Sequence, residues 1–176
     1  MNANLFSRLF DDVKDPSRLA IETADGGRIS YGDLIERSGR TANYLVSRGV
    51  KPGDRAAVQV EKSVQALVLY LATVRAGAVF LPLNTAYTLN EIEYFVGDAE
   101  PSLIVCAPSK FDGITALANG IGAKVDTLDA AGHGSIASPH ARADVHPHPL
   151  SLFQPSHRVV LHAPPPPKFR TDGRAP

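Results

Sequence analysis

The residue with the most reactive side chain in the sequence is its one cysteine, Cys106. A cysteine attacks a substrate as the thiolate, which forms readily only beside positive charge or a general base. Cys106 instead ends the apolar run that starts at Leu103, a pattern typical of a buried strand in which the thiol packs as a small hydrophobic group. We therefore expect no catalytic cysteine. A single cysteine also excludes an internal disulfide and suits a reducing compartment.

A glycine-rich segment, Gly132-His133-Gly134-Ser135-Ile136-Ala137, fits the spacing of a dinucleotide-binding loop. That loop works only when a helix follows at once, because the helix N-terminus binds the pyrophosphate. Here Ser138-Pro139-His140 follows, with no helical pattern and no acidic residue about twenty positions later. We interpret Gly132 and Gly134 as loop glycines.

Two further kinds of residue are potential ligands or acid–base groups. His146 and His148 flank a proline, yet zinc needs three or four ligands on a rigid framework. The acidic pairs Asp11-Asp12 and Glu91/Glu93 fall on expected solvent-exposed helix surface. Neither a Gly-Lys-Ser/Thr phosphate loop nor a Gly-x-Ser-x-Gly elbow occurs. The sequence thus predicts no catalytic, cofactor-binding or metal-binding residue.

The elements that would position a site follow from the spacing of apolar residues. Three-to-four-residue spacing predicts helices and short apolar runs predict strands. The expected helices cover residues 5–13, 30–48, 63–76, 88–99 and 109–119, and the expected strands 19–23, 28–30, 56–60, 78–81, 103–106 and 123–128. From about residue 55 to 128 apolar strands alternate with helices, which indicates a parallel sheet covered on both faces. The predicted fold class is α/β.

Local signals mark the ends of these helices. Ser30 with Asp33, and Thr88 with Glu91, have the spacing of capping boxes. Glycines follow two helices where the chain must leave the helical conformation.

The pattern stops near residue 137. Residues 137–176 hold nine of the fourteen prolines and five of the six histidines, lack glutamate, and include the run Pro164 to Pro167. Residues 1–136 carry a net charge of −3 and residues 137–176 one of +3. Two interpretations remain open: a disordered Pro/His/Arg-rich tail, or a segment read out of frame or from a mis-joined exon. Neither predicts stable structure there.

The overall composition limits the partners and the cellular location that the chain could have. Hydrophobic residues make up 44%, charged residues 20%, and the formal net charge is zero, so nothing favours nucleic acid as a partner. The N-terminus lacks the apolar core of a secretory signal and no segment is long enough for a membrane span. We expect a cytoplasmic protein, and the oligomeric state stays open.

Several short blocks in order resemble the adenylate-forming enzymes, the superfamily of acyl-CoA synthetases, luciferases and peptide-synthetase adenylation domains. The blocks are residues 29–34 (ISYGDL), 49–55 (GVKPGDR), 74–84 (VRAGAVFLPLN), 88–92 (TLNEI) and 98–105 (DAEPSLIV). Residues 2–6 (NANLF), 61–63 (EKS), 69–77 (LYLATVRAG) and 83–88 (LNTAYT) are most similar to malonyl-CoA synthetases. Residues 1–136 would then be a truncated N-terminal part of an AMP-binding ligase domain, with a largely parallel sheet flanked by helices.

The resemblance implies a two-step reaction in the full-length family. A small carboxylic acid attacks the α-phosphate of Mg-ATP, and the thiol of CoA then displaces AMP. The phosphate loop, the ribose-binding acid and the catalytic lysine of the family lie beyond the matched region, so no family residue transfers to a numbered position here. The expected cofactors are ATP, Mg and CoA for the full-length family and none for this chain. The alternatives are a non-catalytic binding or regulatory protein, or a Pro-rich interaction tail on an α/β scaffold.

Overall fold

The computed structural model describes residues 4–137. The expected disordered or out-of-frame tail, the histidines at 146 and 148 and the proline run at 164–167 lie outside the described residues. The elements, in chain order, are α1 (Leu5–Phe10), β1 (Leu19–Glu22), β2 (Arg28–Ser30), α2 (Tyr31–Ser47), β3 (Arg55–Gln59), α3 (Val64–Arg75), β4 (Val79–Pro82), α4 (Leu89–Ala99), β5 (Leu103–Cys106), η1 (Pro108–Lys110), α5 (Phe111–Ile121), β6 (Lys124–Thr127) and η2 (Ser135–Ala137).

The central sheet has four parallel strands in the order β4-β3-β5-β6. Ala56 of β3 is paired with Phe80 of β4 on one side and with Leu103 of β5 on the other. A separate antiparallel hairpin joins β1 to β2. The predicted α/β class and parallel sheet are confirmed.

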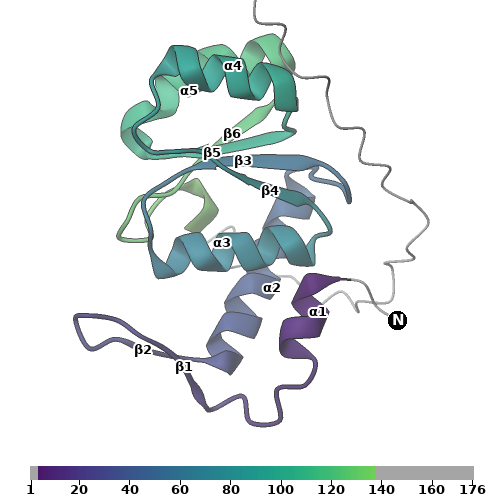
Figure 1. The fold of residues 1–176 in the computed structure, drawn as a ribbon, viewed down its shortest axis with the longest axis vertical. Helices are drawn as coiled ribbons and strands as arrows, with labels where there is room; N and C mark the ends of the chain where they lie inside the picture. The colour runs from purple at the N-terminus through teal and green to yellow at the C-terminus, as the bar shows by residue number, and fades with distance from the viewer. Residues whose placement is uncertain (1–3, 138–176) are drawn as a thin grey trace, which may run out of the picture.

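Helices cover both faces of this sheet (Figure 1). Along β5, Leu103 and Val105 belong to the core shared with α2 and α3, while Ile104 and Cys106 belong to the core shared with α4 and α5. This alternation follows from the two-residue period of a strand. Because both faces are covered, every residue of β5 is fully buried, which explains its continuous apolar sequence.

A third, smaller core holds the N-terminal elements against α3. Phe6, Ile29, Leu34, Val68 and Leu71 form it. Arg75 at the end of α3 stacks on the Phe6 ring, with 4.7 Å from its guanidinium carbon to the ring centroid, and donates a hydrogen bond of 2.8 Å to the Ile35 carbonyl. One guanidinium thus connects α1, α2 and α3.

The expected caps are present. The Ser30 hydroxyl accepts from the Asp33 backbone N–H at 3.1 Å while the Asp33 carboxylate accepts from the Ser30 N–H at 2.8 Å; Thr88 and Glu91 make the same exchange. Gly49 has φ of +90°, its N–H bonds to the Val46 carbonyl and the next N–H to the Leu45 carbonyl, which is a Schellman ending.

Two helix boundaries differ from the sequence prediction. The first helix ends at Phe10 rather than residue 13, because Asp11 and Asp12 place negative charge at the helix C-terminus, where the dipole disfavours it. The predicted helix 109–119 begins instead at Phe111, after a 3₁₀ turn that starts at Pro108.

The two edge strands of the sheet, β4 and β6, have features that hinder pairing with a further strand. At β6, the Thr127 N–H donates to the Ser135 hydroxyl at 2.8 Å and the Ser135 N–H to the Thr127 hydroxyl at 3.0 Å. At β4, Pro82 has no N–H to offer a new strand. Among residues 4–137, no helix combines the length and the hydropathy required to cross a bilayer.

Candidate functional site

The carboxyl ends of β3 and β5 form the place where ligands most often bind in open α/β sheets. The chain leaves β3 toward α3 on one face and leaves β5 toward α5 on the other, so these neighbours define a topological switch point. Gln59 and Cys106 end the two strands and are paired in register.

Protein groups already use the polar atoms at this switch point. The Gln59 side chain, 1% exposed, donates through Nε2 to the Asn84 carbonyl at 2.7 Å. Its Oε1 accepts from Lys110 Nζ at 3.1 Å, and the same ammonium donates to the Thr85 carbonyl at 2.7 Å. The lysine therefore fixes the loop after β4 to the end of β3, which is a positioning role rather than a ligand-binding one.

Cys106 is the last residue of the inner strand β5 and is fully buried. Burial raises the pKa of its thiol from 9.0 to about 11; the Lys110 charge lowers the pKa and the Asp126 charge raises it. At neutral pH the thiol is therefore protonated and enclosed by apolar groups. The predicted structural role of Cys106 is confirmed.

A second polar cluster surrounds Asp126 on β6, which is 2% exposed. Its carboxylate accepts from the Tyr44 hydroxyl at 3.0 Å, the Ser135 hydroxyl at 2.8 Å and Arg48 Nε at 3.0 Å. Burial, followed by the negative charge of Asp126, raises the pKa of the Tyr44 hydroxyl. The cluster joins α2, β6 and the segment before residue 137.

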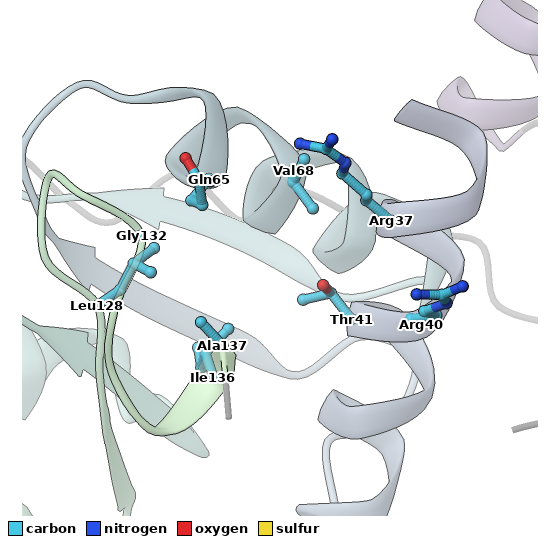
Figure 2. Close-up of a pocket in the computed structure, with 9 residues that line it drawn as sticks. All are labelled: Arg37, Arg40, Thr41, Gln65, Val68, Leu128, Gly132, Ile136 and Ala137. Carbon is cyan, nitrogen blue, oxygen red and sulfur yellow. The ribbon is translucent and has the colours of Figure 1, made fainter. Parts of the chain in front are cut away.

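An open cavity of about 370 Å³ lies between α2, α3 and residues 128–137 (Figure 2). Its polar part comes from Arg37, Arg40 and Thr41 on α2 and Gln65 on α3. Its apolar part is lined by the following residues: Val68, Leu128, Ile136 and Ala137. Cationic and apolar groups together suit a ligand with a carboxylate and an apolar body.

The glycine-rich segment has a packing function. A three-residue 3₁₀ turn, Ser135–Ala137, stands where a dinucleotide-binding loop would need a helix. Gly134 has φ of +141°, and a Cβ atom there would lie 2.1 Å from the Thr127 carbonyl oxygen. The position thus requires glycine because the backbone passes directly against β6. The interpretation as loop glycines is confirmed.

Glu91 and Glu93 lie on α4 as the sequence predicts, whereas Asp11 and Asp12 lie in the turn that follows the end of α1 at Phe10. Asp11, Asp12, Glu91 and Glu93 are all exposed. Hydrogen bonds from the Thr88 backbone and hydroxyl lower the pKa of Glu91, as its capping role requires. Across residues 4–137, no group of three or more His, Cys, Asp or Glu side chains is arranged to hold a metal ion.

Sequence reasoning missed the Asp126 cluster and the cavity. The signal for the first is a charged residue inside a strand pattern, since a buried carboxylate must be paired. The partner Arg48 lies 78 positions away, so its identity is not readable locally. The cavity draws on three separate segments, and no periodicity in the sequence indicates that they meet.

Comparison with known proteins places this fold in a family. The profile of the AMP-binding enzyme family matches residues 11–168. The chain belongs to this family, and the predicted resemblance to the N-terminal part of adenylate-forming enzymes is confirmed.

The solved structures of MatB from Rhodopseudomonas palustris, both apo and ATP-bound, are 62% identical to this chain with a TM-score of 0.79. The match covers 81% of this chain and 28% of the MatB chain. Among curated proteins, the apicidin F synthase of Gibberella fujikuroi is 38% identical over 96 residues, which are 54% of this chain and 2% of that protein. The oxalate–CoA ligase of Arabidopsis thaliana is 33% identical over 108 residues, 60% of this chain and 21% of that protein.

The matched region is therefore a small part of each relative. This chain spans under a third of the MatB chain and about a fifth of the oxalate–CoA ligase. Its described residues supply the four-stranded parallel sheet, the covering helices and the N-terminal hairpin, which correspond to the N-terminal part of the MatB fold.

Proposed function

We propose that this chain is the N-terminal part of an AMP-forming acid–CoA ligase whose full-length form activates malonate. The carboxylate attacks the α-phosphate of ATP, which releases pyrophosphate and leaves an acyl-adenylate. The CoA thiol then attacks the acyl carbon and AMP leaves. Mg would neutralise the phosphate charge. A cytoplasmic location supplies ATP and CoA.

The observation that carries the proposal is the 62% identity to MatB over 81% of this chain. The sequence of residues 83–88 is similar to that of malonyl-CoA synthetases, which supports the same assignment. The ATP-bound state of MatB and the acid–CoA ligase name of the Arabidopsis relative support the same reaction class.

Within the proposed enzyme, residues 4–137 act as scaffold. The hydrogen bonds of Lys110 hold the loop after β4 against β3, and the Asp126 cluster holds the end of the described segment against α2. No described residue is assigned a chemical step, and we expect the 176-residue chain alone to be inactive and prone to aggregation at high concentration. Exposed apolar side chains such as Val46, Val79 and Tyr94 favour association.

The rival interpretation is a non-catalytic binding or regulatory protein built on the same scaffold. The two interpretations differ in how they explain the change of composition at residue 137, which is either a mis-read segment of a ligase or the genuine end of a short protein. Translating the coding DNA in the other two frames from about codon 130 separates the two. A Ser/Thr/Gly-rich loop followed by lysine supports the ligase, and stop codons in both frames support the rival.

A chimera tests the ligase directly. Residues 1–137 replace the matched N-terminal region of R. palustris MatB, and malonate-dependent pyrophosphate release is measured with ATP and CoA present. We expect turnover similar to that of MatB, because the graft supplies an equivalent scaffold. The 176-residue chain is the matched control and should release none. A folded but inactive chimera would contradict the proposal.

A further inference from the structure

We draw no further inference here: the strongest candidate, the side-chain cluster in which Gln59 and Lys110 hold the loop after β4 to the end of β3, belongs to the site already described, and nothing in residues 4–137 shows a ligand or partner that it would position.

Discussion

Arg48→Met should destabilise the fold far more than its partly exposed position at the C-cap of α2 suggests. Its Nε donates at 3.0 Å to Asp126, whose side chain is 3% exposed, and its second guanidinium nitrogen donates at 3.3 Å to the Val125 carbonyl. Removing the arginine leaves the buried carboxylate with the hydroxyls of Tyr44 and Ser135 but without a cation. A buried charge that loses its partner costs about 3–5 kcal/mol.

The expected loss is smaller than that range. The Arg48 side chain is 33% exposed, so water re-enters beside Asp126 after the substitution and solvates part of the charge. Two charge-assisted or polar hydrogen bonds are lost, and the Met side chain keeps most of the packing of the arginine stem. We therefore expect a loss of about 2 kcal/mol, a large share of the roughly 5–15 kcal/mol typical of a domain.

Urea unfolding followed by far-ultraviolet circular dichroism measures this loss, at low protein concentration to limit association. Arg28→Met is the matched control, because the Arg28–Glu22 pair is exposed and 3.7 Å apart, so the control should change stability by less than about 0.5 kcal/mol. In the double variant Arg48→Met with Asp126→Asn, the loss of unfolding free energy should be smaller than the sum of the two single losses by about 1 kcal/mol or more. A loss for Arg48→Met no larger than that of the control would refute the pairing.

Two other substitutions test the buried centre and the closing loop. The folded-state pKa of Cys106 lies above its ordinary value, so the buried thiol contributes its full stability below about pH 9 and loses that contribution as the pH rises toward 11. Cys106→Ala should therefore flatten the fall in unfolding free energy between about pH 9 and 11. An unchanged slope in that window would contradict the burial effect. Gly134→Ala should lower the free energy of unfolding by about 2 kcal/mol or more, because the added Cβ would meet the Thr127 backbone. The control Gly120→Ala on α5, where a Cβ would have nothing within 4 Å, should be neutral or stabilising. Equal effects of the two substitutions in thermal unfolding would contradict the observed path of the loop.

The sequence predicts those parts of the fold that local physics decides. Ser30 and Thr88 signal helix starts because a cap needs only a hydroxyl and an acid three residues later. The run Leu103 to Cys106 indicates a buried strand because both faces of the sheet are covered. Alternation of these elements was sufficient for the α/β class.

Long-range pairing could not be predicted in the same way. Nothing near Asp126 indicates that its partner is Arg48 at the C-cap of α2, and nothing near Gln59 indicates Lys110, 51 positions later. The cavity lies where α2, α3 and residues 128–137 meet, and their meeting depends on the strand order β4-β3-β5-β6, which periodicity does not encode. The absence of any assigned catalytic residue remains a prediction for the chain as a whole.

The central claim is that residues 4–137 form the opening scaffold of a malonate-activating ligase. Its most direct test is malonate-dependent pyrophosphate release by the chimera of residues 1–137 with the remainder of R. palustris MatB. The scaffold assignment predicts release at a rate similar to that of MatB. A soluble chimera with native-like circular dichroism and no release above the level without malonate would contradict it.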